Sequence, residues 1–238
     1  MTEGARTAEA QTTRRPAVTV SYAQTLDGRL ATANGASQWI SCPESLVFAH
    51  EMRASHDAVM IGVGTACADD PRLTVRHAPG DDPLRVVVDS SLRLPPTAAV
   101  LANKAAKGTV LAVTERAPKA RREEARALGA RVLKLPEDAS GRVDLGALMT
   151  VLRKGGVRSV MVEGGAALIT SLFYNQLVDR LAVCVAPKIL GRGMEAIGDL
   201  GICELVDSIA LVDLSVTTLG VDLILDARVV YPGASDEG

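Results

Sequence analysis

The sequence has few aromatic residues, no clustered cysteines and no surplus of positive charge. Phe, Trp and Tyr make up 3% of its 238 residues, against 47% hydrophobic residues overall, so a sizeable core must consist mainly of aliphatic side chains. With 26 Lys and Arg against 28 Asp and Glu, the formal net charge is -2, which indicates neither a nucleic-acid nor a membrane partner. Because no apolar run is long enough to span a bilayer, we expect a cytoplasmic protein.

The pattern also gives no sign of disulfide or metal chemistry. The four cysteines are far apart and form no C-x-x-C pair, and the three histidines lie at no zinc-ligand spacing from them. We therefore expect reduced thiols and no metal site. The polar start lacks the apolar segment of a signal peptide. We expect residues 1–16 to be a disordered tail and residues 233–238 a frayed one, around a single domain at residues 17–232.

Between these ends, Val-rich strands alternate with helices. Strands are expected at residues 17–23, 57–65, 83–89, 108–114 and 157–165, and helices at residues 42–56, 118–130, 144–156 and 166–176. Ser41 is the expected N-cap of the first helix, with Glu44 at the capping-box position. Buried strands separated by helices predict an α/β fold with a mostly parallel sheet. The apolar segments at 178–190, 208–220 and 221–232, with no long helix between the last two, predict antiparallel strands at its edge.

One segment has the pattern of a phosphate-binding turn. In VMVEGGAALITSL a buried strand ends at Glu163, two glycines follow, and a helix begins. Glycines let the backbone approach a ligand closely, and a helix N-terminus offers free N–H groups to a phosphate. The same pattern also occurs as a plain tight turn. Because a carboxylate beside a phosphate would repel it, Glu163 is expected either to face substrate hydroxyls or an amine, or to cap its own helix.

Two further segments carry polar groups at turns. VGTACADDPRLTVR places two aspartates before Pro71, which disfavours helix at Asp70 and predicts a turn there. Arg76 then binds a ligand phosphate or forms a surface ion pair. The turn-rich TLDGRLATANGASQWIS carries the one tryptophan, Trp39, as a flap over a ligand or as a hydrophobic plug. No Ser-His-Asp set or metal cluster emerges, so an enzyme with this sequence would rely on a bound cofactor for the reactive atom.

Four separated blocks together resemble one known family. TLDGRLATANGASQWIS, MRASHDAVMIGVGTACADDPRLTVR, PLRVVVDSSLRLP and VMVEGGAALITSLFYNQLVDRLAVCVAPKILG are similar, in order and spacing, to the reductase domain of the bacterial riboflavin-biosynthesis deaminase/reductase and its stand-alone archaeal and fungal relatives. The resemblance covers most of residues 17–193. It implies a dihydrofolate-reductase-like fold and NADPH as hydride donor. It also implies, as substrate, a pyrimidine with a 5-phosphoribosylamino group, reduced at ribose C1 to the ribityl chain.

The resemblance further implies which residues contact substrate and cofactor, and it implies a homodimer. The positions aligned with substrate contacts are Ser37, Arg53, Leu73, Arg76 and Glu163. The positions aligned with cofactor contacts are Ala23, Trp39, Thr65, Asp69 and Ser90, and the cofactor-phosphate loop aligns with Gly165, Ala166, Ala167, Leu168, Ile169, Thr170 and Ser171. Glu163 is the expected catalytic residue, which stabilises a cationic imine or holds substrate hydroxyls. Independently of the resemblance, charge and position just beyond expected strand ends make Arg93 and Arg116 candidates for binding the 2′-phosphate of NADPH, or else plain surface arginines. A homodimer is expected, with LAVCVAPKIL and the apolar C-terminal strands as its face.

Departures from the family pattern leave the substrate open. Thr25 replaces the usual Ser before L-D-G, and Ser21 stands where many bacterial members carry a lysine. The deaminated pyrimidine, its 2,5-diamino precursor and another compound are therefore all compatible with the sequence. The H-A-E…P-C-x-x-C zinc signature is absent, so no deamination is expected. The alternatives are a same-fold reductase of pteridine or secondary metabolism, a dihydrofolate reductase, and a non-catalytic binding protein.

Overall fold

The structure of the chain is a computed structural model, and it describes residues 15–38 and 40–233. Its strands are Ala17–Thr25 (β1), Arg29–Thr32 (β2), Ala58–Gly62 (β3), Leu84–Val88 (β4), Thr109–Val113 (β5), Arg131–Lys134 (β6), Ser159–Gly164 (β7), Arg180–Ala186 (β8), Gly193–Glu195 (β9), Ala210–Leu219 (β10) and Asp222–Val230 (β11). Its helices are Pro43–Ala54 (α2), Val63–Asp69 (α3), Lys119–Ala127 (α4), Leu145–Lys154 (α5) and Ala166–Tyr174 (α6), with 3-10 turns at Ala99–Leu101 (η1), Asn103–Gly108 (η2) and Leu205–Asp207 (η3).

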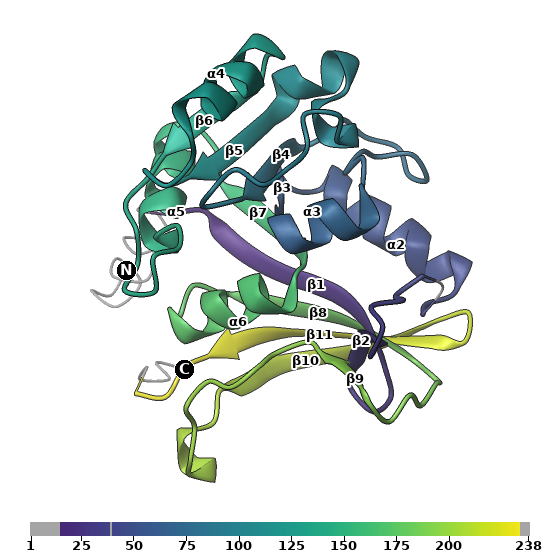
Figure 1. The fold of residues 1–238 in the computed structure, drawn as a ribbon. Coiled ribbons are helices and arrows are strands. Elements are labelled where there is room, and N and C mark those ends of the chain that lie inside the picture. Colours follow the sequence, from purple (N-terminus) through teal and green to yellow (C-terminus); the bar gives the residue numbers. More distant parts are fainter. Residues whose placement is uncertain (1–14, 39, 234–238) are drawn as a thin grey trace, which may run out of the picture.

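Within the described residues, nine strands form one sheet in the order β10-β11-β8-β1-β7-β3-β4-β5-β6 (Figure 1). Pairing is parallel from β8 to β6. It is antiparallel between β8 and β11 and between β11 and β10. The predicted mostly parallel sheet with antiparallel C-terminal strands is therefore confirmed.

Alternating side chains along the strands pack into two hydrophobic clusters. In β5, Val110 and Ala112 belong to one cluster, while Leu111 and Val113 belong to the other. The first cluster includes the apolar faces of α5 and α6, and the second includes residues of α3 and α4. Both faces of the parallel strands are thus covered by helices, which explains why these strands read as continuous apolar runs rather than as an alternating pattern.

The helix α2 starts one residue later than its capping pattern predicted. Its N-cap is Cys42, followed by Pro43 at the first helical position, and no side chain caps it. The Cys42 N–H instead donates to Asp222 Oδ2 at 2.7 Å. The prediction of Ser41 as N-cap was wrong because Pro43 favours the first position of a helix, and because a distant carboxylate supplies the acceptor.

Two further details of the fold differ from the sequence-based expectation. Arg15, expected in the disordered tail, forms an ion pair with Asp179, with Nη1 and Nη2 each 2.7 Å from a carboxylate oxygen. Asp179 Oδ2 also accepts the Val18 N–H at 2.7 Å, so the ordered chain begins before Ala17. The short pairing of β2 with β9 was not predicted, since each strand is too short to show a period.

The C-terminal edge of the sheet is apolar and open. The strand β8 lies between β1 and β11, and six of its seven residues are buried. Residues 181–186 of the expected dimer face LAVCVAPKIL are therefore sheet interior, whereas Ile189 and Leu190 at its end are 75% and 38% exposed. In β10, by contrast, Leu211, Leu214 and Val216 are 46%, 57% and 56% exposed. The strand β10 thus presents apolar side chains at the edge of the sheet.

Candidate active site

A cavity of about 930 Å³ lies at the carboxyl ends of the central parallel strands. Its walls are the ends of β1, β3, β4 and β7, the starts of α3 and α6, and the loops that follow β4, β5 and β6. Ligands of open α/β sheets bind outside the carboxyl ends of the strands, and pockets of this size hold small molecules and cofactors. Its position and volume make this cavity the candidate active site.

The predicted phosphate turn borders the cavity. Gly164 and Gly165 have φ angles of 157° and 92°, values that few residues other than glycine adopt. A Cβ atom on Gly165 would stand 3.3 Å from Thr65 Oγ1 and 3.6 Å from Gly62 N, so a side chain here would press on the start of α3. No side chain caps α6. The N–H groups of its first turn therefore face the cavity region without a side-chain acceptor, as a phosphate subsite requires.

Most residues predicted to bind the cofactor line this cavity. They are Ala23, Thr65, Asp69, Ser90, Gly165, Ala166, Ala167, Leu168 and Ser171. Trp39 lies outside the described residues. Burial raises the pKa of Asp69, so this carboxyl group is partly desolvated at the cavity wall.

Two residues of the predicted cofactor loop do not line the cavity. The Ile169 side chain is 0% exposed and packs in the core. Its predicted contact is corrected, because this face of α6 covers the sheet. The Thr170 hydroxyl donates to Ala166 O at 2.7 Å and accepts the Gly198 N–H at 2.8 Å. Within the predicted loop, the cavity-lining residues are therefore those of the first turn together with Ser171.

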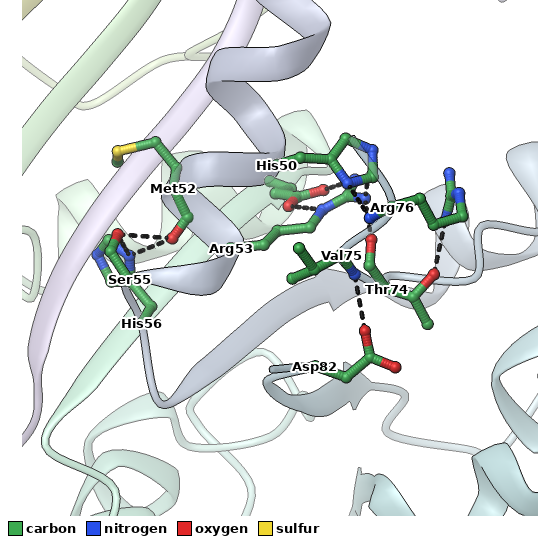
Figure 2. A network of polar contacts seen from close by, with 10 residues as sticks. His50, Met52, Arg53, Ser55, His56, Thr74, Val75, Arg76 and Asp82 are labelled. Carbon is green, nitrogen blue, oxygen red and sulfur yellow. Dashed lines mark hydrogen bonds and ion pairs between the residues drawn. The ribbon is translucent and has the colours of Figure 1, made fainter. Parts of the chain in front are cut away.

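Glu163 borders the cavity and pairs with Arg53. Arg53 belongs to a network of polar side chains on α2 and the segment before β4 (Figure 2). Arg53 Nε and Nη2 donate to the two carboxylate oxygens of Glu163, the latter at 2.6 Å. The two side chains are only 12% and 13% exposed, and a bidentate pair of this kind is strongly oriented. Glu163 therefore bonds to Arg53, and the alternative in which it caps α6 is not realised.

The other residues predicted to bind substrate have different environments. Ser37 lines the cavity. Arg76 Nη1 donates to Thr74 Oγ1 at 2.6 Å, and burial together with the guanidinium groups of Arg53 and Arg72 lowers its pKa. Because these neighbouring positive charges repel one another, an anion bound beside Arg76 would be stabilised.

The side chain of Leu73 cannot contact a substrate in the cavity. That side chain is 1% exposed and belongs to the core cluster that includes α3 and α4. The main chain of Leu73 has a φ angle of 53°, which turns the segment toward the network. The substrate contact of Leu73 stays a prediction, and it would have to be made by the main chain.

The turn that the DDP sequence predicted is present. Asp70 has a left-handed φ of 41°, and its Oδ1 accepts the Ala99 N–H at 2.7 Å. Asp70 therefore has a structural role in the turn, while the neighbouring Asp69 lines the cavity.

A row of arginines borders the opposite part of the cavity lining. Arg93, Arg116 and Arg142 follow β4, β5 and β6 in turn, and all three line the cavity. Arg116 Nη1 donates to Gly141 O at 3.0 Å, and Arg142 Nε donates to Ser140 Oγ at 2.7 Å. Arg142 was missed in the sequence because the short edge strand β6 was not predicted. Consecutive parallel strands ending at one sheet edge are the signal that would have found it.

His50 was also missed. It lies three residues before Arg53 on α2, a spacing that places two side chains on one helix face, and it is 0% exposed. A lone buried histidine in a sequence has no distinguishing pattern, so the structure was needed to show its contacts.

Residues 15–38 and 40–233 contain no group of three His, Cys, Asp or Glu side chains placed to hold a metal ion. No helix in these residues is both long and apolar enough to cross a membrane.

The fold and the cavity together define an α/β protein with a ligand-sized cavity at the carboxyl ends of its strands. The chain matches the RibD C-terminal domain family over residues 16–225, and it belongs to this family. This confirms the resemblance found in the sequence.

Individual relatives agree with this assignment. The chain is 44% identical over 221 residues to the 2,5-diamino-6-ribosylamino-4(3H)-pyrimidinone 5′-phosphate reductase of Methanothermobacter thermautotrophicus, covering 90% of this chain and 99% of that protein. It is 38% identical to riboflavin biosynthesis protein RibD of Aquifex aeolicus, covering 90% of this chain but only 58% of that protein.

Solved structures confirm the dihydrofolate-reductase-like fold. Acinetobacter baumannii RibD aligns with a TM-score of 0.80 at 28% identity, covering 93% of this chain and 60% of that chain. The Saccharomyces cerevisiae riboflavin biosynthesis reductase Rib7 aligns with a TM-score of 0.69 at 25% identity, covering 91% and 90%.

Proposed function

We propose that this chain is an NADPH-dependent reductase that reduces the ribosyl side chain of a 5-phosphoribosylamino-pyrimidine to the ribitylamino product of riboflavin biosynthesis. It acts as a single domain over residues 17–232, in the cytoplasm. One observation carries the proposal: the glycine turn before α6 and the Glu163 carboxylate, which Arg53 holds in place, border the same cavity. A phosphate subsite and an oriented carboxylate thus lie within one ligand's length of each other.

The cavity fits a dinucleotide cofactor. Its volume of about 930 Å³ and the uncapped start of α6 suit a diphosphate and its flanking sugars. Gly165, Ala166 and Ala167 would hold the diphosphate, and Thr65 and Asp69 would hold polar groups further along. When bound, NADPH supplies the hydride for the reduction.

The chain's own groups orient the reacting atoms. Arg53 fixes both oxygens of Glu163, so the carboxylate accepts hydrogen bonds from substrate hydroxyls or faces a positively charged imine. The contribution of the protein is therefore orientation and charge stabilisation at ribose C1.

We assign the substrate phosphate to Arg76, which lies next to the Glu163–Arg53 network and is not itself among the cavity-lining residues. Three of the five N–H groups of Arg53 bond to Glu163 and to Thr74 O, so the role that we assign to Arg53 is to orient the carboxylate. Arg76 uses its Nη1 atom on a hydroxyl within its own segment. It keeps further N–H groups for the phosphate and, as a planar guanidinium, suits a pair of phosphate oxygens.

The 2,5-diamino pyrimidine is the first substrate to test. The Methanothermobacter relative named for that compound is covered over 99% of its length, whereas the Aquifex RibD relative is covered over 58%. Ser21, the position that left the substrate open, is 8% exposed within β1 and is absent from the residues that line the cavity.

The deciding experiment follows NADPH oxidation with the 2,5-diamino compound, the deaminated compound and dihydrofolate in parallel. We expect turnover with one of the two phosphoribosylamino-pyrimidines and none with dihydrofolate. NADPH binding without turnover of either pyrimidine would indicate another substrate, and absence of NADPH binding would refute the proposal altogether.

We also propose a homodimer, formed through β10 rather than β8. Leu211, Leu214 and Val216 leave an apolar strand exposed at the sheet edge, and such edges are normally covered. Light scattering at micromolar concentration should give the mass of a dimer for the wild type. A Leu214→Lys variant should give the mass of a monomer, and a monomeric wild type would contradict the proposal.

A further inference from the structure

The segment that carries Arg76 has no regular structure of its own. Residues 70–76 lie outside helices and strands, so the segment's main-chain groups lack a ladder of hydrogen-bond partners. Three successive residues instead bond to side chains from elsewhere. Thr74 O accepts from Arg53 Nη1 at 3.0 Å, Val75 N–H donates to Asp82 Oδ1 at 2.7 Å, and Arg76 N–H donates to His50 Nδ1 at 2.9 Å (Figure 2).

His50 is the innermost of these partners. Its side chain is 0% exposed, whereas the Asp82 side chain is 46% exposed. His50 Nε2 lies 3.4 Å from Arg53 Nη1, and the ring meets that of His77 edge-on, with centroids 4.7 Å apart. One side chain of α2 thus touches both the main chain of Arg76 and the guanidinium that orients Glu163.

The contacts determine the protonation of the ring. Because Arg76 N–H donates to Nδ1, that nitrogen carries no proton, and a neutral ring carries its proton on Nε2. A doubly protonated ring would lose its acceptor and add a positive charge beside Arg53 and Arg76. Burial, followed by the charges of Arg53, Arg76 and His77, lowers the pKa of His50 to about 4, so the ring is a neutral acceptor at neutral pH.

We propose that His50 is a positioning residue, which fixes the main chain at Arg76 so that the guanidinium is held at the substrate-phosphate position. This inference rests on the proposed function, in which Arg76 binds that phosphate. His50 itself touches neither substrate nor cofactor. Its effect should appear in substrate affinity and leave cofactor affinity unchanged, because the glycine turn of α6 is built from other elements.

The chain offers a matched set of variants. His50→Leu removes the hydrogen-bond acceptor and fills the site with an apolar side chain of similar size. His50→Asn keeps an oxygen acceptor at about the place of Nδ1. His56→Leu is the control: His56 follows the same helix, but its ring nitrogens contact Met52 O at 2.7 Å and Thr19 Oγ1 at 3.1 Å, away from residues 74–76.

Two measurements on the full chain decide the inference. The first compares the change in KM for the pyrimidine substrate with the changes in KM for NADPH and in kcat. The second is amide hydrogen exchange of the Arg76 N–H, read by NMR without any ligand. In His50→Leu we expect the substrate KM to rise about tenfold with the NADPH KM unchanged, and the Arg76 amide to exchange faster. His50→Asn should restore most of both values, and His56→Leu should change neither.

The possible outcomes separate the two proposals. If the wild type turns over no pyrimidine, the proposed function fails, and the exchange rate of the Arg76 amide still tests the role of His50. If His50→Leu leaves that rate and the substrate KM at wild-type values, the positioning role is overturned. An equal rise of both KM values, not restored by His50→Asn, would also overturn it, since that result indicates general destabilisation.

Discussion

The two polar regions that border the cavity hold their charges in different ways. In the network around Arg53, the guanidinium bonds to both oxygens of Glu163 and to a main-chain carbonyl, and the pair is only 12% and 13% exposed. In the arginine row, Arg93 has no polar partner among the described residues, and the Arg142 side chain is 55% exposed. The first region is preorganised, and the second consists of charges near solvent.

This difference sets the size of the effects that substitutions should have. Preorganised groups in a partly desolvated site lose much when one member is removed. Exposed cations contribute less, and salt screens their contribution. The network should therefore control rate and substrate affinity by large factors, and the arginine row should adjust cofactor preference by small ones.

The largest effect is expected for Glu163→Gln, which preserves shape and removes the charge. If Glu163 stabilises a cationic imine, kcat should fall about a hundredfold, equivalent to ~2.7 kcal/mol, while the Kd for NADPH barely changes. Steady-state kinetics and a fluorescence titration of NADPH measure the two quantities. Unchanged turnover would remove Glu163 from the chemistry and leave it a partner of Arg53.

The second effect is expected for Arg76→Ala. Loss of a charged hydrogen-bond donor to the phosphate should cost roughly 1.5–3 kcal/mol of substrate binding, about ten- to a hundredfold in affinity. NADPH affinity should be unaffected. The matched control is a substrate analogue without the phosphate, for which the wild type and the variant should bind equally. If the variant binds the phosphorylated substrate as well as the wild type does, the phosphate lies elsewhere.

Both of these predictions concern residues that were assigned to the site from the sequence. The local sequence patterns around the site could be interpreted correctly. The strand–Gly–Gly–helix pattern and the DDP corner are local, so their geometry could be read from neighbouring residues. Leu73 and Ile169 were assigned to the site by alignment, and both side chains proved to be buried. Sequence position does not show which face of a turn or helix is covered.

The contacts that join distant segments could not be predicted. Glu163 and Arg53 are separated by 110 residues, and their pairing depends on where the tertiary fold places α2 and β7. The Cys42 N–H finds its acceptor at Asp222, 180 residues away, which displaced the predicted helix cap. Such partners are set by the tertiary fold, so a single sequence carries no local signal for them.

The third effect concerns pH. His50 has a pKa of about 4 in the folded chain, against roughly 6.5 in an unfolded one. Between these values the unfolded chain binds a proton that the folded chain does not, so stability present above pH 6.5 is lost as the pH falls toward 4. Relative to His50→Asn, the wild-type free energy of unfolding should fall more steeply, by up to about 1.4 kcal/mol per pH unit.

Urea titrations of both proteins at several pH values between 4 and 7 measure this difference in slope. The carboxyl groups that the two proteins share contribute to both curves and cancel in the comparison. Parallel curves over the whole range would show that His50 takes up its proton in the folded network, contrary to its assignment as a neutral acceptor.

The smallest effect is expected in the arginine row, for Arg142→Ala. The turn that carries Arg142 is fixed, because Asp138 Oδ1 accepts the N–H groups of Ser140 and Arg142 at 2.8 Å and 2.9 Å. The guanidinium itself is exposed, so its attraction to the 2′-phosphate of NADPH should be worth about 1 kcal/mol. The preference for NADPH over NADH should thus fall about fivefold, and less at high salt.

Lys134→Ala is the control, since Lys134 pairs with Glu115 at 2.7 Å and is not among the cavity-lining residues. Titrations of both cofactors at low and high salt give the ratios. An equal loss of affinity for NADPH and NADH in Arg142→Ala would place the 2′-phosphate away from Arg142 and leave Arg93 and Arg116 as its remaining partners in the row.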